Sequence, residues 1–290
     1  MNKIFRFLAI SAISVAFATL SIAWAQTYTT VDFPGATATF LIGGPNPQGT
    51  SVGQETTAGV NHGFTLTAAG VFTAFDPPGS IFTIANFITA DGMIVGQFQD
   101  ASHVEHGFVL YKGQYATFDV PGALGTVLSS VNPSGEMTGL ICLKDPTCET
   151  PPYESFTVSS QGVTTLFNPF GSVSSFASAV NPSGTVVGIY TDSSGVTHGY
   201  KLYQGSFTSN DFPGSIFTFD GGINSGGDIV GSYTDTSNVT HSFLLSQGVY
   251  TSFDPPGATL SEASGINPAG VIVGVYADSA NVLHGYIRTP

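Results

Sequence analysis

The chain has 290 residues, of which 42% are hydrophobic and 12% aromatic, enough apolar surface to fold one large domain or two small ones. Only 9% are charged, against about 25% in an average soluble protein, and the formal net charge is −13. This acidic balance excludes a nucleic-acid binder and a protein that docks on anionic membranes, because both need a basic surface.

The first 25 residues have the pattern of a secretory signal peptide. Lys3 and Arg6 precede an apolar run over 7–22, and Ala23-Trp24-Ala25 supplies a cleavage site of small residues. The apolar run is short for a membrane span, which takes about 20 residues, although an uncleaved N-terminal anchor is the alternative. No second run of that kind follows. We therefore expect a secreted protein, extracellular or periplasmic, without a membrane span in its mature chain, 26–290.

Three motifs recur along this mature chain in a fixed order. An Asp-x-Pro-Gly motif, with variants, ends at Gly35, Gly79, Gly122, Gly171, Gly214 and Gly257. An Asn-Pro-x-Gly motif, degraded in two copies, begins at positions 46, 89, 132, 181, 224 and 267. A His-Gly-Phe/Tyr motif and its variants begin at His62, His106, Glu154, His198, His241 and His284. The common spacing of about 43 residues predicts six structural repeats in one domain.

Each repeat reads as four short strands separated by tight turns. In the last copy the strands are expected at 249–253, 259–266, 271–276 and 283–288, and no helical period is present. Four strands in about 43 residues are typical of a β-propeller blade. The segment 28–32 has the character of a fourth strand without its own blade. We therefore predict an all-β, six-bladed β-propeller of six separate sheets, closed by the N-terminal strand, which joins the last blade; an open β-solenoid is the alternative.

The motifs also resemble a known repeat family. The His-x-Phe step, the Asn-Pro-x-Gly-x-x-Val-Gly block and the Phe-Asp-x-Pro-Gly block are similar to those of the extracellular HAF-repeat family, although Gly or Ser stands where the namesake has Ala. The resemblance covers essentially the whole mature chain. It implies export and a repeat fold, and it implies no established catalytic activity.

The third repeat departs from the pattern by a short insertion. This segment holds both cysteines of the chain, Cys142 and Cys148, and in an oxidising compartment we expect them to form a local disulfide. One interpretation is a rigid recognition loop that stands out from one face. Its candidate binding residues are Lys144, Asp145, Glu149 and Tyr153. The alternative is a tolerated surface insertion with its own covalent link.

Two carboxylates interrupt positions that are otherwise apolar on the first strand of each repeat. When the six repeats are aligned, one position, which we call a column, holds Phe40, Ile84, Val127, Phe176, Phe219 and, in the last repeat, Glu262. The next column holds Leu or Ala in five repeats and Asp220 in the fifth. As a pair near the propeller axis they are the weak candidates for acid–base catalysis or cation binding. Adjacent columns point to opposite faces of a strand, so a structural role is the alternative.

Five of the six histidines occupy one repeat position. We interpret His62, His106, His198, His241 and His284 as structural residues that bond to an Asp or to backbone, because symmetry-related positions lie too far apart to share a metal ion. No metal site or cofactor is predicted; Ca²⁺ is the one ion left open, at the acidic turns.

The sequence contains no catalytic triad order, zinc spacing or phosphate-binding loop. The first functional hypothesis is therefore an exported, monomeric, non-catalytic scaffold that binds a glycan, a cell-surface component or a protein. The second is an extracellular hydrolase or lyase that acts on a carbohydrate or ester near the axis. A self-assembling envelope protein is the third.

Overall fold

A computed structural model describes residues 26–290, and the predicted signal peptide, 1–25, lies outside the described residues. Within 26–290 the regular structure consists of β-strands and one short 3₁₀ turn, η1 (Pro169–Gly171). In this range no helix has the length and apolar character that a membrane crossing needs.

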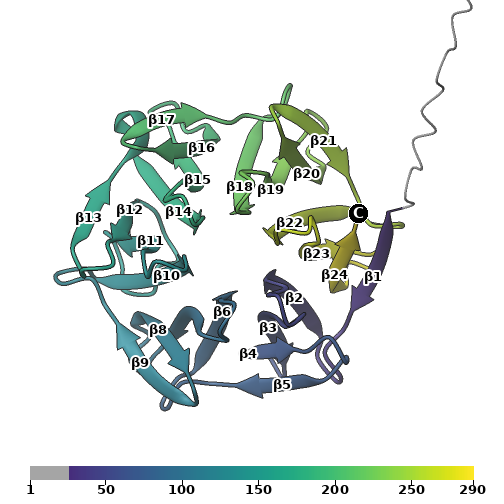
Figure 1. Cartoon of the computed structure of the whole chain (residues 1–290), viewed down its shortest axis with the longest axis horizontal. Coiled ribbons are helices and arrows are strands. Elements are labelled where there is room, and N and C mark those ends of the chain that lie inside the picture. Colours follow the sequence, from purple (N-terminus) through teal and green to yellow (C-terminus); the bar gives the residue numbers. More distant parts are fainter. Residues whose placement is uncertain (1–25) are drawn as a thin grey trace, which may run out of the picture.

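The strands form six antiparallel meanders, each of four strands, which surround a common centre (Figure 1). The first meander contains β2 (Ala38–Gly43), β3 (Ser51–Thr57), β4 (Val60–Leu66) and β5 (Phe72–Phe75). The second contains β6 (Phe82–Ile88), β7 (Ile94–Gln99), β8 (Glu105–Tyr111) and β9 (Gln114–Phe118), and the third β10 (Gly125–Val131), β11 (Met137–Cys142), β12 (Tyr153–Val158) and β13 (Thr164–Phe167). The fourth contains β14 (Ser174–Val180), β15 (Val186–Thr191), β16 (Thr197–Tyr203) and β17 (Ser206–Ser209). The fifth contains β18 (Phe217–Ile223), β19 (Ile229–Thr234), β20 (Thr240–Ser246) and β21 (Val249–Phe253), and the sixth β22 (Leu260–Ile266), β23 (Ile272–Ala277), β24 (Leu283–Thr289) and β1 (Thr27–Val31).

The number of sheets differs from the prediction of six. Four meanders are separate four-stranded sheets, whereas the sixth and the first belong to one eight-stranded sheet. A single parallel bridge between Ala38 and Leu283 joins them, because the first residues of β2 and β24 come within pairing distance. The prediction of six separate sheets is therefore wrong, although the order of strands within each meander is as expected.

The N-terminal strand is paired with the C-terminal strand. β1 runs antiparallel to β24 in a register from Thr27–Thr289 to Val31–Gly285. A contact of 2.7 Å between His284 Nδ1 and a carboxylate oxygen of Asp32 continues this pairing beyond β1. The sixth meander thus takes its outer strand from the other end of the described chain, as the sequence predicted.

Each repeat buries one large aromatic side chain on its third strand. These residues are Phe64, Phe108, Phe156, Tyr200, Phe243 and Tyr286, and all are essentially inaccessible to solvent. The glycine of the Val-Gly step on the neighbouring strand makes room for the ring. At Gly96, for example, an added Cβ would lie 2.7 Å from the Phe108 ring and 2.1 Å from the Ile84 carbonyl oxygen. The glycine in the repeat is therefore required by close packing rather than by a turn.

Candidate functional site

The strand nearest the centre of each meander contains one β-bulge at the same repeat position. The register shifts in β2, β6, β10, β14, β18 and β22, and each shift leaves one residue unpaired. The unpaired residues are Ile42, Asn86, Ser129, Ser178, Gly221 and Ser264, and we call them the bulge tier. All six line the central cavity. A bulge frees a residue from the ladder and redirects its side chain, so the six bulges build the inner wall of this cavity.

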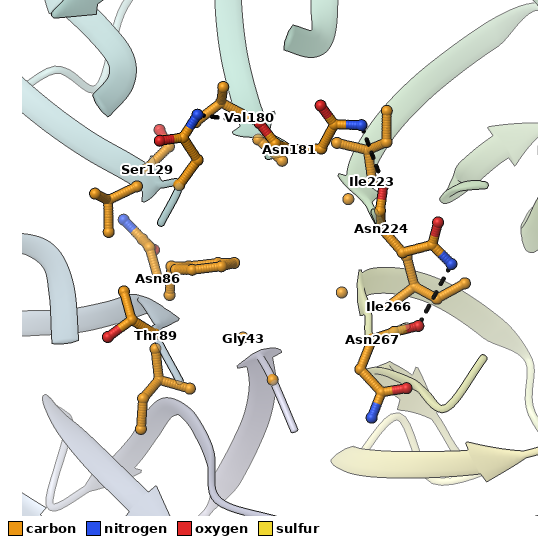
Figure 2. A pocket seen from close by; sticks show the side chains of 18 of the residues that line it. Gly43, Asn86, Thr89, Ser129, Val180, Asn181, Ile223, Asn224, Ile266 and Asn267 are labelled. Atoms are coloured by element: carbon orange, nitrogen blue, oxygen red, sulfur yellow. Dashed lines mark hydrogen bonds between the residues drawn. The ribbon is translucent and has the colours of Figure 1, made fainter. Parts of the chain in front are cut away.

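The central cavity has a volume of about 440 Å³ and is open to solvent at its rim. This volume lies in the range of about 300–1,000 Å³ that is usual for small-molecule sites. Beside the bulge tier, the apolar part of its wall includes Ile88 and Val131. Val180, Ile223 and Ile266, labelled in Figure 2, also belong to it. Of the residues that the structure describes, none with an ionisable side chain lines this cavity. The cavity is thus lined by apolar and neutral polar side chains, although the chain as a whole is strongly acidic.

Asparagine side chains tie neighbouring meanders together around the rim. Nδ2 donates to a carbonyl oxygen of the next meander in the pairs Asn46–Thr89, Asn132–Asn181, Asn181–Asn224, Asn224–Asn267 and Asn267–Pro45, at 3.0–3.4 Å. Figure 2 shows Asn181, Asn224 and Asn267 in this arrangement. Thr89 lacks an amide, and there Asn86 of the bulge tier donates to the Leu128 carbonyl at 3.0 Å instead. We call these six bonds the asparagine belt; it fixes the shape of the cavity mouth.

Two serine hydroxyls of the bulge tier are buried against the cavity. Ser129 is 5% exposed and Ser178 is 8% exposed, and neither hydroxyl has a hydrogen-bond partner within residues 26–290. A buried hydroxyl without a partner costs on the order of 1–3 kcal/mol. Next to them, the rings of Phe176 and Phe219 lie nearly parallel, with centroids 6.4 Å apart, and both line the cavity. The cavity therefore offers an aromatic surface, whereas the oxygens of the two hydroxyls are covered by protein atoms and do not open into it.

The two candidate catalytic carboxylates do not meet. Asp220 is completely buried and its Oδ2 accepts a hydrogen bond from Asn210 Nδ2 at 3.0 Å. Glu262 is the third residue of β22 and is equivalent to Phe219 in β18, one position before Asp220. Because side chains alternate along a strand, the positions of Glu262 and Asp220 face opposite sides of the sheet. Burial raises the pKa of both carboxyl groups, and neither residue lines the central cavity. The structure thus gives no shared acid–base site to this pair.

The insertion lies between β11 and β12, and the predicted disulfide between Cys142 and Cys148 is confirmed. The loop folds back onto the second meander rather than standing out from a face. The Pro146 carbonyl accepts a hydrogen bond from the Glu105 backbone N–H at 2.7 Å, and the Thr147 carbonyl accepts one from Gln99 Nε2 at 3.4 Å. These contacts with another repeat hold the loop against the second meander, and its role in recognition stays a prediction.

The four candidate binding residues of the loop divide into two kinds. Asp145 accepts hydrogen bonds from the hydroxyls of Thr147 and Thr150, which lower the pKa of its carboxyl to about 2. Tyr153 Oη donates to the Cys148 carbonyl at 3.0 Å. These two side chains hold the loop in shape, whereas Lys144 and Glu149 are exposed to solvent.

The loop also covers a buried carboxyl group that belongs to none of the repeated motifs. Glu105 begins β8 and is 1% exposed. Its Oε1 has no hydrogen-bond partner within the described chain. Burial raises the pKa of the Glu105 carboxyl to about 7, although Gln99 and Gln97 lower it in part. It is therefore a carboxyl that changes charge near neutral pH under a disulfide-closed loop.

The repeated histidines bind aspartates of the Asp-x-Pro-Gly motif. Nδ1 lies 2.7–3.1 Å from a carboxylate in the pairs His62–Asp76, His106–Asp119, His198–Asp211, His241–Asp254 and His284–Asp32. In the third repeat both partners differ, and Asn168 donates to Glu154 at 3.2 Å. These contacts are those that the structural interpretation predicts. Over 26–290 no three His, Cys, Asp or Glu side chains are grouped as a metal site.

Solved structures of β-propeller proteins are similar to this chain. A putative TolB from Agrobacterium tumefaciens matches with a TM-score of 0.60 and 13% identity over 86% of this chain and 89% of that one. A catalytically inactive virginiamycin B lyase from Staphylococcus aureus with quinupristin matches at 0.52 and 11% identity, over 91% and 99%. An Aleuria aurantia lectin variant with α-methyl-L-fucoside matches at 0.50 and 11%, over 89% and 93%.

At these identities the similarity shows a propeller-like fold and leaves the function open. No protein-family profile matches the sequence, and no curated protein sequence matches it either.

Proposed function

We propose that the chain is a closed six-bladed β-propeller that binds a small uncharged ligand in its central cavity and catalyses no reaction. In this proposal the six meanders are six blades, and the Ala38–Leu283 bridge is a contact between the last blade and the first. The asparagine belt supports a closed ring, because its bonds include one from Asn267 to Pro45, between the sixth meander and the first.

One observation carries the binding function: the chain encloses a central cavity of about 440 Å³ whose wall has no ionisable group and includes the rings of Phe176 and Phe219. Binding needs shape and a few polar groups, whereas general acid–base catalysis needs a side chain that exchanges a proton near neutral pH. Among the residues that line the described cavity, none has such a side chain. This composition favours a binding module over the alternative hydrolase or lyase.

Export and membership of the HAF-repeat family are further parts of the proposal. The signal-like segment 1–25 and the Cys142–Cys148 disulfide support an oxidising, extracytoplasmic location. Expression of the whole chain in a secreting bacterial host tests this. A product recovered outside the cytoplasm that begins at Gln26 supports export, and a product that retains residues 1–25 in the cytoplasm contradicts it.

A thermal-shift screen tests the position of the ligand site. The secreted protein is screened against neutral small molecules, neutral glycans and Ca²⁺, and each hit is repeated on two variants. Ser178→Phe fills the cavity, and Ser237→Phe adds the same ring at an exposed turn. We expect hits to stabilise the wild type and the Ser237→Phe variant but not the Ser178→Phe variant. Equal stabilisation of all three would move the site away from the cavity and towards the outer loops.

A further inference from the structure

We propose that one end of the meanders is a docking surface for a protein partner in which Lys or Arg residues alternate with apolar ones. This end carries the Asp-x-Pro-Gly crossovers between meanders and the hairpins between the second and third strands of each meander, and we call it the aspartate face. In an antiparallel meander it lies opposite the hairpins between the first and second strands, which carry most of the asparagine belt. The inference adds a second surface and does not depend on a ligand in the central cavity.

The repeated histidines hold the crossovers and the hairpins of the aspartate face side by side. His284 Nδ1 lies 2.7 Å from Asp32, in a crossover, and its Nε2 lies 3.5 Å from Asp278, in a hairpin. The same Asp–His–Asp arrangement occurs in the second, fourth and fifth meanders, at His106, His198 and His241. The side chains of the aspartates in contact with these histidines are 36–56% exposed, apart from Asp254 at 35%. The face therefore presents a ring of carboxylates to solvent.

Basic side chains do little to offset these carboxylates. Lys112 lies in the β8–β9 hairpin, and Lys201 and Arg288 lie in the second halves of β16 and β24, towards the opposite end of the meanders. Among the described Lys and Arg residues, only Lys144, in the insertion, lies at the aspartate face. A field of one sign attracts a partner of the opposite charge and repels anionic lipids and nucleic acids.

Exposed apolar side chains lie next to the carboxylates. Beside Asp235, the Ile216 backbone N–H donates to the carbonyl of the preceding Thr234, and the Val239 N–H donates to Asp235 Oδ1. Ile216 is 47% exposed and Val239 36%. Equivalent positions in other meanders are also apolar and exposed: Ile81, Leu124, Val173, Val196 and Val282. Single exposed apolar residues are ordinary, but a set that recurs around one face marks a contact with another protein.

The two features together select the partner. A cationic glycan or a metal ion would match the carboxylates but leave the aliphatic side chains in water, whereas a protein can cover both. A metal ion also finds the hairpin carboxylates in use. Asp235 Oδ1 accepts hydrogen bonds from the N–H groups of Ser237 and Val239, and its Oδ2 lies 3.8 Å from His241 Nε2. Lys or Arg residues that alternate with apolar ones match both features of the face.

Fluorescence anisotropy with labelled synthetic peptides tests the class of partner on the whole secreted protein. (Lys-Leu-Ser)₅ has charge and apolar side chains, (Lys-Ser-Ser)₅ has the charge alone, and (Glu-Leu-Ser)₅ reverses the charge. We expect the first peptide to bind about fivefold more tightly than the second, and the third to show no binding in the same range. Raising NaCl from about 50 mM to about 300 mM should weaken the binding of both lysine peptides. Deacetylated chitosan, a cationic glycan, should compete no better than (Lys-Ser-Ser)₅.

Charge variants locate the binding surface. The first removes three hairpin charges from the aspartate face: Asp192→Asn, Asp235→Asn and Asp278→Asn. Asparagine preserves such turns, because Asn267 Oδ1 accepts equivalent bonds from the N–H groups of Ala269 and Val271. The matched control removes three charges from hairpins at the opposite end: Asp91→Asn, Glu136→Gln and Asp228→Asn. An exposed ion pair is worth a factor of about two, so the first variant should bind (Lys-Leu-Ser)₅ about tenfold more weakly, and the control should change by less than about twofold.

Apolar variants test the second feature of the face. One variant replaces three of its exposed aliphatic residues: Val196→Ser, Ile216→Ser and Val239→Ser. The matched control replaces three exposed valines at hairpins between third and fourth strands: Val71→Ser, Val163→Ser and Val249→Ser. The first variant should lose the preference for (Lys-Leu-Ser)₅ over (Lys-Ser-Ser)₅, and the control should keep it. Thermal unfolding confirms that each variant is folded.

The outcomes separate the two parts of the inference. Equal losses in the two charge variants would mean attraction by net charge alone and would overturn the docking surface. Equal binding of the two lysine peptides, or chitosan that competes as well as (Lys-Leu-Ser)₅, would overturn the protein partner. The peptide comparison needs only the wild type, so it tests the proposal even where a variant does not fold.

Discussion

Asn210 Nδ2 donates a hydrogen bond to Asp220 Oδ2 at 3.0 Å in a fully buried interface between the fourth and fifth meanders. In the other repeats the position of Asn210 holds an apolar residue: Val31, Phe75, Phe118, Phe167 or Phe253. The position of Asp220 holds Leu41, Ala85, Leu128, Ala177 or Ala263. The two polar residues therefore occur together, each in contact with the other, and this pairing explains the irregular carboxylate as a structural feature.

The pair should behave as one unit in unfolding experiments. Asn210→Phe leaves the Asp220 carboxyl without its donor, and Asp220→Leu leaves the Asn210 amide without its acceptor; each should lower the free energy of unfolding by about 2 kcal/mol or more. The double variant restores the apolar arrangement that Phe118 and Leu128 form around Gly107. Urea unfolding should show that it recovers at least about 1 kcal/mol relative to the sum of the single changes. Strict additivity would show that the two side chains are not coupled.

Glu105 should make the stability of the protein depend on pH. Burial raises the pKa of this carboxyl to about 7, so the folded state holds its proton where the unfolded chain has released it. The folded state with a protonated Glu105 keeps its full stability below the unfolded pKa of about 4.5, and the wild type loses this stability as the pH rises through 7. Glu105→Gln should therefore be more stable than the wild type above pH 7, by up to about 3 kcal/mol, with the difference vanishing near pH 4.5.

Denaturant unfolding between pH 4.5 and pH 8.5 measures this effect. His106 and the exposed Glu149 are the neighbouring charged groups, and Glu149 is the smallest of the causes that act on the Glu105 carboxyl. Glu149→Gln is therefore the matched control and should keep most of the slope of the wild type. A Glu105→Gln variant with an unchanged slope would assign the pH dependence to other groups.

The Cys142–Cys148 disulfide should keep water away from Glu105. Replacing both cysteines by serine removes a short covalent loop, which should cost about 2 kcal/mol. A looser loop would also hydrate the Glu105 carboxyl and bring its pKa back towards the ordinary range. The variant should thus lose part of the pH dependence described above, and the same unfolding series measures both effects. Lower stability with an undiminished pH slope would mean that the loop still covers Glu105 without its covalent link.

His284 should stabilise the junction of the two chain ends in a pH-dependent way. Burial lowers the pKa of its imidazole, but hydrogen bonds and charges from Asp32 and Asp278 outweigh burial and raise it above the ordinary value. The stabilisation is therefore complete below pH 6.5 and is lost as the pH rises through the folded pKa. Hydrogen exchange of the β1 amides should be faster in His284→Gln, and more so at pH 6 than at pH 9 after correction for intrinsic rates. His62→Gln, which breaks a contact within the first meander, should leave β1 exchange unchanged.

The repeated strands could be predicted because turn residues mark their ends. From residue 249 onward the expected strands 249–253, 259–266, 271–276 and 283–288 agree within a residue or so with Val249–Phe253, Leu260–Ile266, Ile272–Ala277 and Leu283–Thr289. Proline, asparagine and glycine fix the backbone at each turn, and this local chemistry is visible in a single sequence. The pairing of β1 with β24 was also predictable, because a fourth-type strand stood alone at the start.

The bulge tier could not be predicted, because its residues share a backbone shape and no side-chain type. Ile42, Asn86, Ser129 and Gly221 occupy equivalent bulges, and alternation of faces along a strand says nothing of where a bulge falls. Phe176 and Phe219, two residues before the bulge in their strands, also line the cavity. The resting place of the insertion was equally hidden, because it depends on Glu105 and Gln99 in a different repeat.

The pairing of β1 with β24 sets the order in which the molecule can be completed. A ribosome makes β1 before any other strand of the described chain and β24 after all of them. β1 therefore cannot pair until β24 has been synthesised. Until β24 is made, the sixth meander has two strands, β22 and β23, and the edge of β23 is open to pairing with another polypeptide. Chains that stop short of Leu283 should for that reason associate with one another, because they lack the strand that covers β23 and pairs with β1.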